Sequence, residues 1–187
     1  MIGYAFCGSF CCHKQSLEQL IRLTDMGYEV LPIFSERVQC TDTRFGKAAD
    51  LIREAEIICG RKGVKDITEA EKQITNSAVD VLVVSPCTGN TLAKTALGIT
   101  DGAVTMAIKA HLRNKKAVLL AFASNDGLSG SLKNIAALLE KKNVYFVPLR
   151  QDDPVKKPSS LVCAWDKLPE ALEAAKEGKQ LHPLIVA

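Results

Sequence analysis

Residues 80–91 read DVLVVSPCTGNT, and this stretch gives the clearest indication of the fold class. Its aliphatic run lacks the polar–apolar alternation of a half-exposed strand, so the pattern is typical of a strand buried on both faces. Pro86 ends the run, and the small hydroxylated residues that follow can cap a helix. The stretch therefore predicts a buried parallel strand over 80–85, a polar loop, and a helix over 91–97.

The same order of strand, turn and helix recurs along the rest of the chain. Apolar runs predict further strands over 2–7, 28–34, 117–123 and 144–149. Helical spacing predicts helices over 16–26, 45–58, 67–77, 103–113, 131–141 and 169–176, and residues 151–160 predict a polar loop. This alternation predicts a three-layer α/β/α fold with a doubly wound parallel sheet, Rossmann-like or flavodoxin-like, in a single domain over 1–187.

The composition narrows the functional classes. Hydrophobic residues make up 47% of the chain and charged residues 24%, which is typical of a globular protein. The longest apolar runs, such as 117–123, are far too short for a transmembrane helix. The net charge is only +3, whereas nucleic-acid binders usually carry a denser basic face, so we expect no nucleic-acid partner. The start of the chain has no secretory signal pattern, so we expect a cytoplasmic location.

The seven cysteines and three histidines do not form the pattern of a metal site. No two cysteines are spaced as C-x-x-C, and the adjacent Cys11, Cys12 and His13 suit tetrahedral zinc poorly. In a reducing cytoplasm the cysteines are expected to be thiols. We therefore predict no metal and interpret the cysteines as small apolar side chains.

The residues that follow each strand are the candidates for a site, because parallel sheets bind ligands beyond the carboxyl ends of their strands. Gly8, Ser9 and Phe10 follow the first strand, where a glycine admits a ligand to the backbone and a serine can hold a phosphate. The motif G-x-G-x-x-G is absent, and a tight turn explains these residues equally well. Ser35, after the second strand, can place another hydroxyl near the same phosphate.

The loops after the third and fourth strands are also rich in small polar residues. Residues 85–91 combine helix-capping groups with space for a flat ligand, and Gly98, Gly102 and Thr105 form a second turn before a helix. Ser124 and Asn125 begin a loop that either covers a ligand or is a plain surface loop. A capped pair of helices accounts for the capping residues but not for the whole run over 85–91.

The segment PCTGNT at 86–91 resembles the PASANT segment of the flavoprotein family that includes the flavin-containing cysteine decarboxylases and the flavin prenyltransferases. That family continues with a helix and a G-I-x-D turn, which GITD at 98–101 matches, and its first phosphate-binding loop resembles the turn at residues 8–9. The resemblance implies a bound flavin mononucleotide (FMN). The cofactor-binding residues that it implies are Gly8, Ser9, Phe10, Ser35, Ser85, Pro86, Thr88, Gly89, Asn90, Thr91 and Thr105.

The resemblance also divides these residues by role. Gly8, Ser9 and Ser35 are implied to hold the phosphate. The residues implied to line the ribityl chain and the ring are Ser85, Pro86, Thr88 and Asn90. Ser124 and Asn125 fall where the decarboxylases carry a substrate clamp. No catalytic residue is implied.

Three stretches resemble one branch of that family, and this resemblance covers essentially all 187 residues: SNDGL at 124–128, YFVP at 145–148 and QDDPVKKP at 151–158. Members of the branch are one component of a two-component synthase that forms pyridine-2,6-dicarboxylate in the mother cell of sporulating bacteria. The resemblance implies an oxidoreductase role, a partner subunit that binds NAD(P), a dihydro- or hydroxytetrahydro-dicarboxylate substrate, and a homo-oligomer based on trimers. Candidate cations for the substrate carboxylates are Arg37, Arg44, Lys94 and Lys133.

The chain also departs from the decarboxylases of the family. Those enzymes carry an active-site histidine after the second strand, but residues 36–80 contain none. The proline and methionine of their substrate clamp are replaced here by Phe122 and Ser124. Two alternatives to an oxidoreductase subunit therefore stay open: a non-catalytic subunit that binds flavin or supports the partner, and an FMN-dependent decarboxylase or flavin prenyltransferase.

Overall fold

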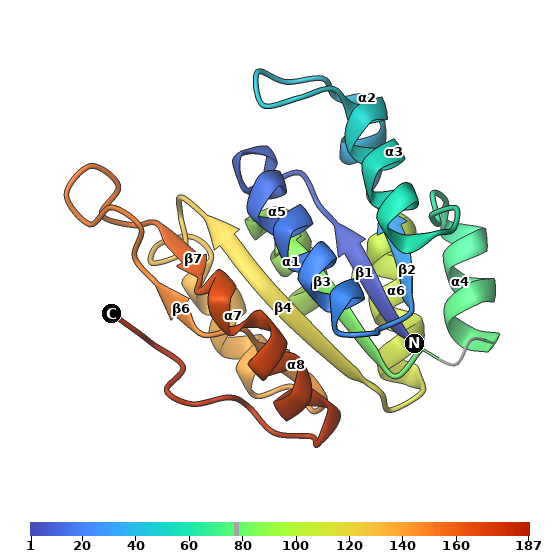
Figure 1. The fold of residues 1–187 in the computed structure, drawn as a ribbon. Helices are drawn as coiled ribbons and strands as arrows, with labels where there is room; N and C mark the ends of the chain where they lie inside the picture. Colours follow the sequence, from blue (N-terminus) through green and yellow to red (C-terminus); the bar gives the residue numbers. More distant parts are fainter. Residues whose placement is uncertain (77–78) are drawn as a thin grey trace.

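The computed structural model describes residues 1–76 and 79–187 (Figure 1). Within this part, one sheet contains the strands β1 Ile2–Phe6, β2 Val30–Phe34, β3 Val81–Cys87, β4 Ala117–Ser124, β5 Val144–Phe146, β6 Leu149–Arg150 and β7 Leu161–Cys163. The α-helices are α1 His13–Asp25, α2 Glu36–Cys40, α3 Ala48–Cys59, α4 Ile67–Asn76, α5 Gly89–Leu97, α6 Ala103–Arg113, α7 Leu132–Leu139 and α8 Leu168–Lys176. Short 3-10 helices precede α1 (η1, Phe10–Cys12) and α8 (η2, Trp165–Lys167).

The order of the strands creates a crevice at one edge of the sheet. The five parallel strands lie in the order β2-β1-β3-β4-β5, which is the flavodoxin-like arrangement. β2 and β3 lie on opposite sides of β1 in the sheet. The loops that follow β1 and β3 therefore run in opposite directions from the carboxyl ends of these strands, and the crevice between the loops is where such sheets bind ligands.

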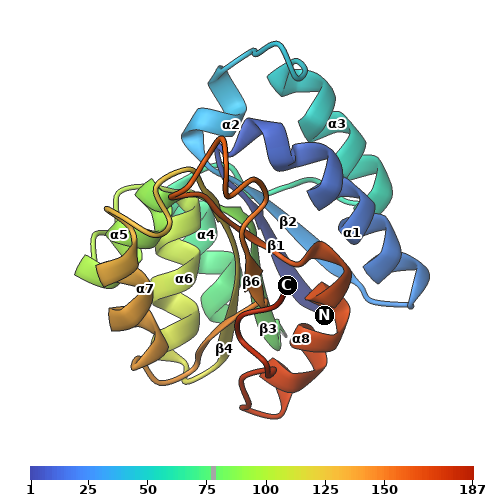
Figure 2. The same cartoon turned by 90° about the vertical axis from the view of Figure 1, so that its left-hand side faces the viewer.

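Helices cover both faces of the sheet. The strands require this, because their sequences do not alternate between polar and apolar residues. Alternate residues of β1, β3 and β4 enter two separate apolar clusters, one beneath α1, α3 and α8 and the other beneath α4, α5, α6 and α7. Figure 2 shows these two helical layers on opposite sides of the sheet. The prediction of a three-layer α/β/α fold with a doubly wound parallel sheet is thus confirmed, although β7 adds antiparallel pairs that the prediction did not include.

The structure differs from the sequence prediction mainly in the last third of the chain. The strand expected over 144–149 is two short strands, β5 and β6, and β7 falls in a region where no strand was expected. β7 pairs antiparallel with both β4 and β6, because the loop over 151–160 turns the chain back on itself. The short helix α2 was also not expected, and α3 begins three residues later than predicted. The last residue of the helix predicted over 67–77 lies outside the described residues.

None of the described helices has the length and apolar character needed to cross a bilayer.

His111 makes the stability of the fold depend on pH. Its ring is fully buried in α6, and neither ring nitrogen has a hydrogen-bond partner among the described residues. Burial, followed by the nearby Lys116, lowers the pKa of His111 to about 4, although Asp80 opposes this shift. Because the unfolded chain binds this proton near pH 6.5 and the folded chain does not, stability is full above that pH and is lost as the pH falls toward 4.

We expect this one residue to lower the free energy of unfolding by about 2 kcal/mol between pH 7 and pH 5. Urea unfolding at the two pH values, on wild type and His111→Leu, measures the effect. The leucine variant should lose the share that His111 contributes, whereas His13, whose pKa is also lowered by burial, keeps its own share in both proteins. An equal pH dependence in both proteins would show that His111 is not the titrating group.

Candidate functional site

Two adjoining cavities open at the carboxyl ends of the strands. The first, of about 710 Å³ and here called the Ser35 cavity, is lined by Gly8, Phe10, Ser35, Glu36, Arg37, Thr88, Asn90, Thr91, Lys94, Asp101, Gly102, Val104 and Thr105. The second, of about 410 Å³ and here called the Ser9 cavity, is lined by Gly8, Ser9, Cys11, Cys12, Thr88, Gly89, Asn90, Ala123, Ser124, Asn125, Asp126, Asp152, Lys157, Ser160, Leu161 and Val162. Gly8, Thr88 and Asn90 line both, so the two cavities meet at the crevice between β1 and β3.

Ser35 gives the Ser35 cavity an unused hydrogen-bonding group. Its Oγ atom is buried and has no hydrogen-bond partner among the described residues. The residue lies between the end of β2 and the start of α2, with its backbone N–H bonded to the carbonyl of Phe6. Burial of an unpaired hydroxyl is costly, and such a group is explained when a polar ligand completes it.

The turn after β1 contributes backbone to both cavities. Gly8 does not have a positive φ, and a Cβ atom there would lie 3.5 Å from the Phe10 ring and 3.6 Å from the Arg37 Cβ, which are ordinary contacts. The fold therefore does not require a glycine, and the missing side chain leaves the backbone open to the cavities. The Ser9 hydroxyl donates to the Ala123 carbonyl at 3.1 Å, which ties this turn to the end of β4.

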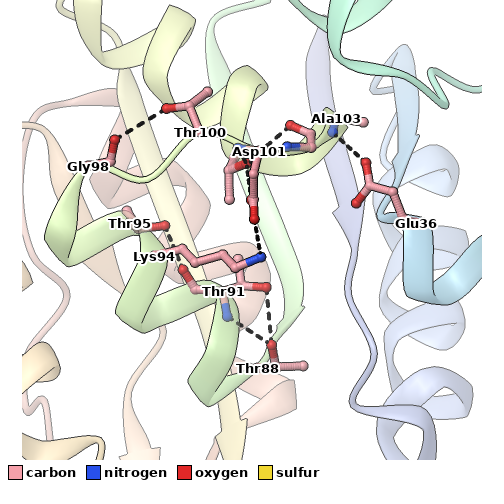
Figure 3. Close-up of polar contacts among 11 residues, drawn as sticks. Glu36, Thr88, Thr91, Lys94, Thr95, Gly98, Thr100, Asp101 and Ala103 are labelled. Carbon is pink, nitrogen blue, oxygen red and sulfur yellow. Dashed lines mark hydrogen bonds and ion pairs between the residues drawn. The ribbon is translucent and has the colours of Figure 1, made fainter.

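The loop after β3 is held in place by its threonines (Figure 3). The Thr88 hydroxyl accepts a hydrogen bond from the Thr91 N–H at 3.1 Å and so caps α5. The Thr95 hydroxyl donates to the Thr91 carbonyl at 2.8 Å, one turn further along the helix. These hydrogen bonds fix the position of Thr88 and Thr91. The neighbouring Asn90 is exposed and lines both cavities at the point where they meet.

The start of α6 forms another wall of the Ser35 cavity, and three backbone N–H groups there already donate hydrogen bonds to side chains. The Thr105 hydroxyl accepts from the N–H of Gly102 at 3.1 Å and from that of Asp101 at 3.2 Å. The Glu36 carboxylate accepts from the Ala103 N–H at 3.0 Å (Figure 3). A Cβ atom on Gly102 would overlap this carboxylate, so the glycine is needed for the contact.

Two cations and two anions line the Ser35 cavity. The Lys94 ammonium lies 2.6 Å from the Asp101 carboxylate, and this hydrogen bond is the main cause of the lowered pKa of Asp101. Arg37 forms no ion pair with any described residue. Of the four basic residues that the sequence suggested as anion partners, the structure places Arg37 and Lys94 in the cavity, whereas Arg44 and Lys133 line neither cavity.

The Ser9 cavity is organised around Asp126. This carboxylate accepts hydrogen bonds from Ser124 and from Ser131, the latter at 3.0 Å, and so folds the loop after β4. A Cβ atom on Gly89 would lie 2.9 Å from the Ser131 Oγ and 3.2 Å from Asp126, so the glycine allows α5 to start against this loop. Asn125, at the tip, is exposed and lines the cavity.

The loop over 151–160 closes the far side of the Ser9 cavity. Lys157 and Asp152 form an ion pair at 3.2 Å, and hydrogen bonds from Ser160 and then Lys157 lower the pKa of Asp152. The Cys11 and Cys12 sulfurs, 3.8 Å apart, lie on the same cavity. Burial raises the pKa of Cys12 to about 12, so this thiol is protonated near neutrality and is a poor nucleophile.

The structure brings most of the predicted residues together, but it separates Ser85 and Pro86 from the rest. Both are buried, and neither lines either cavity. The Ser85 hydroxyl lies 2.9 Å from the Tyr4 hydroxyl and 3.2 Å from that of Ser16, in a buried network beneath α1. The Ser85 side chain therefore faces the core beneath α1, and not the cavities.

The sequence prediction did not include several charged residues of the cavities: Glu36, Asp101, Asp126, Asp152 and Lys157. Asp101, Asp126, Asp152 and Lys157 lie in the stretches GITD, SNDGL and QDDPVKKP, which carry the family resemblance, but that resemblance gave these charges no role. For Glu36 the available signal was position, since it follows Ser35 directly.

Cysteines but no histidines lie at the two cavities, where Cys11 and Cys12 line the Ser9 cavity. The three histidines are all described, and none lines the Ser35 or the Ser9 cavity. His13 lies within 2.8 Å of the Cys7 carbonyl, and burial lowers its pKa. No group of three or more potential metal ligands occurs in the described part of the chain.

A flavodoxin-like strand order places the ligand-binding crevice between β1 and β3, which is where flavodoxin binds FMN. In agreement with this, residues 47–177 match the flavoprotein family, and the chain belongs to that family. It is 37% identical over 185 residues to the B subunit of dipicolinate synthase from Bacillus subtilis (strain 168), a match that covers 99% of this chain and 92% of the relative.

Solved structures support the same relationship. The crystal structure of the dipicolinate synthase B subunit from Bacillus halodurans C has 38% sequence identity and a TM-score of 0.90, with 100% of this chain and 95% of that chain covered. The FMN-dependent cysteine decarboxylase SpaF shares the fold, with a TM-score of 0.68 at 23% identity over 93% of this chain and 95% of that one.

Proposed function

We propose that this chain is the B subunit of a dipicolinate synthase and binds FMN at the Ser35 cavity. In this role it acts with the nicotinamide-binding A subunit of the synthase, which carries NAD(P), to form dipicolinate from a dihydro- or hydroxytetrahydrodipicolinate precursor. The identity of 37% over nearly the whole chain supports this assignment. The proposed place of action is the cytoplasm of the mother cell during sporulation.

The observation that carries the FMN proposal is the buried, unpartnered Ser35 hydroxyl at a flavodoxin-type crevice. A phosphate oxygen there would accept the hydrogen bond that no described protein group accepts. Gly8 leaves its backbone open beside it, and Thr91 and Thr105 line the same cavity. The residues present therefore fit a ligand with a phosphate and several hydroxyl groups.

The two cavities suggest a division of work between cofactor and substrate. When bound, FMN supplies an acceptor for the hydrogen removed as the substrate ring becomes aromatic. We assign the phosphate to Ser35, Gly8 and Ser9, and the rest of the cofactor to Phe10 and Thr88, Gly89, Asn90, Thr91 and Thr105. Ser9 and Gly89 line only the Ser9 cavity, so in this assignment the cofactor reaches the junction of the two cavities. Asn90 faces both cavities, so it can contact the cofactor while Ser124 and Asn125 orient a substrate in the Ser9 cavity.

A visible absorption spectrum tests the FMN proposal. The purified chain is soaked in FMN and passed over a gel-filtration column, and we expect flavin absorption to elute with the protein. Riboflavin is the matched control, because it carries the same ring and ribityl chain without the phosphate. Protein that elutes colourless after soaking would contradict the proposal.

A supporting role without chemistry of its own is the second candidate. The absence of a histidine from both cavities favours it over a decarboxylase, because the family decarboxylases rely on one. An activity assay distinguishes a supporting subunit from a catalytic one. The precursor is incubated with this chain alone, with the nicotinamide-binding partner alone, and with both together. Product from this chain alone would exclude a purely supporting role.

Exposed apolar side chains next to the Ser35 cavity suggest contacts between copies of this chain. Leu97, the last residue of α5, is 73% exposed, and Ile99, in the turn between α5 and α6, is 44% exposed. Both lie close in sequence to Lys94 and Asp101, which line the cavity. Neighbouring exposed apolar side chains mark an interaction site when they form a contiguous patch. We propose that the chain forms a homo-oligomer based on trimers, which light scattering coupled to gel filtration can test.

A further inference from the structure

The Ser35 cavity has an unusual balance of charge for a site that is proposed to hold a phosphate. Two carboxylates, Glu36 and Asp101, line it together with two cations, Arg37 and Lys94. A phosphate monoester brings a further charge of about −1.5 to −2 near neutral pH. The cavity therefore needs a cation that is not already committed to a carboxylate.

Lys94 does not meet this need. Its ammonium group forms a 2.6 Å ion pair with Asp101 on the wall of the cavity (Figure 3). The pair is partly buried, with 30% of the lysine side chain exposed. Turning Lys94 toward a phosphate would leave Asp101 as an unpaired anion in the same cavity, so the net gain in attraction would be small.

The start of α6 does not meet it either. Helix N-termini attract anions through their free N–H groups and the helix dipole. Here the Glu36 carboxylate already accepts the Ala103 N–H at 3.0 Å, and the absence of a side chain on Gly102 makes room for it. The chain has thus placed its own anion at this helix end, where a second anion would be repelled.

We propose that Arg37 is the counter-ion of the ligand phosphate and sets the preference of the site for a phosphorylated flavin. This inference rests on the proposed binding of FMN. Arg37 lines the Ser35 cavity, forms no ion pair among the described residues, and lies in the chain two residues after the unpartnered Ser35 hydroxyl. Its Cβ is 3.6 Å from the position of a Cβ on Gly8, which places its side chain beside the open backbone of that turn. A guanidinium group can donate hydrogen bonds to two phosphate oxygens at the same time.

Glu36 has the opposite effect in this proposal. It fixes the start of α6 to the chain after β2, and its charge opposes the phosphate. Removing that charge while keeping the hydrogen bond should therefore strengthen phosphate binding. Glu36→Gln does this, because the amide oxygen can still accept the Ala103 N–H.

The experiment measures the dissociation constants of FMN and riboflavin for wild type, Arg37→Gln, Arg37→Lys and Glu36→Gln by fluorescence titration. The ratio of the two constants isolates the phosphate, since both ligands share the ring and ribityl chain. We expect R37Q to weaken FMN by about tenfold or more, R37K by less, and neither to change riboflavin by more than about twofold. E36Q should tighten FMN by about two- to fivefold, and R37Q should also reduce the salt dependence of FMN binding.

The possible outcomes distinguish this inference from the proposed function. If R37Q binds FMN as wild type does, or weakens FMN and riboflavin equally, Arg37 is not the phosphate counter-ion, although FMN binding stands. If wild type binds neither flavin, both the proposed function and this inference fail. A circular dichroism spectrum of each variant identifies any loss of flavin affinity that comes from misfolding. If the Arg37 variants misfold, E36Q remains as an independent test. An E36Q protein with the FMN affinity of wild type would count against the inference.

Discussion

Replacement of Ser35 by aspartate is expected to weaken FMN binding by at least about 100-fold, because it puts a carboxylate where the phosphate is proposed to lie. The native hydroxyl is buried and unpartnered at the edge of the Ser35 cavity. The new negative charge would face the phosphate in a partly dehydrated site, where repulsion is stronger than in bulk water. Fluorescence titration of the variant with FMN measures the loss.

Two controls define the cause of that loss. Ser35→Ala removes the donor without adding charge, and it should weaken FMN by only about three- to tenfold. Riboflavin should bind the aspartate variant nearly as well as wild type, because it has no phosphate to be repelled. An S35D protein with wild-type affinity for FMN would show that the phosphate binds away from Ser35.

The fold was predictable because each main strand carries its own local signal. The run over 81–84 has no polar residue, and a strand with this pattern is stable only when both faces are covered. Turn residues and helical spacing then separate the strands. The short strands β6 and β7 carry no such signal, because they span two and three residues. They depend on pairing with each other and, for β7, with the end of β4.

The candidate site was predictable only in part. Gly8, Ser35 and Thr88 follow apolar strands, so their position at the carboxyl edge follows from the fold class alone. Ser85 shows the limit of that reasoning, since it is still within β3 and shares the face of Val81 and Val83, which lies under α1 and α3. Because successive side chains of a strand point to opposite faces, the position of Ser85 relative to Val81 and Val83 already placed its side chain on the α1 face. That placement is decided by the alternation along the strand, and not by how close Ser85 lies to the polar loop.

The charged residues of the site depend on three-dimensional contacts that have no local signature. Glu36 contacts Ala103 across 67 positions of sequence, and this contact requires the missing side chain of Gly102. Lys157 and Asp152 enter the Ser9 cavity because the loop between β6 and β7 turns back beside β4. Without an element that predicts this turn, sequence reasoning cannot assign either residue to the site.

Tyr4→Ala is expected to lower the free energy of unfolding by about 3–5 kcal/mol, which is a large part of the 5–15 kcal/mol typical of a domain. Tyr4 is fully buried in β1, with its ring 5.2 Å from that of Phe6. Its hydroxyl lies 2.9 Å from the Ser16 carbonyl and 2.9 Å from the Ser85 Oγ, which joins β1 to α1 and β3. The substitution removes this aromatic packing and the hydrogen bonds of the Tyr4 hydroxyl, and it leaves Ser16 and Ser85 with only the bonds that they make to each other.

Urea unfolding, followed by circular dichroism and by the fluorescence of Trp165, measures the loss, and two milder variants divide it. Tyr4→Phe keeps the packing and removes only the hydroxyl, so we expect it to cost about 1–3 kcal/mol. Ser85→Ala should cost about 1 kcal/mol and leave the FMN affinity of the folded protein unchanged, because its side chain faces this network and not the cavities. A Ser85→Ala protein of normal stability with weakened FMN binding would reverse that assignment and restore Ser85 to the cofactor site.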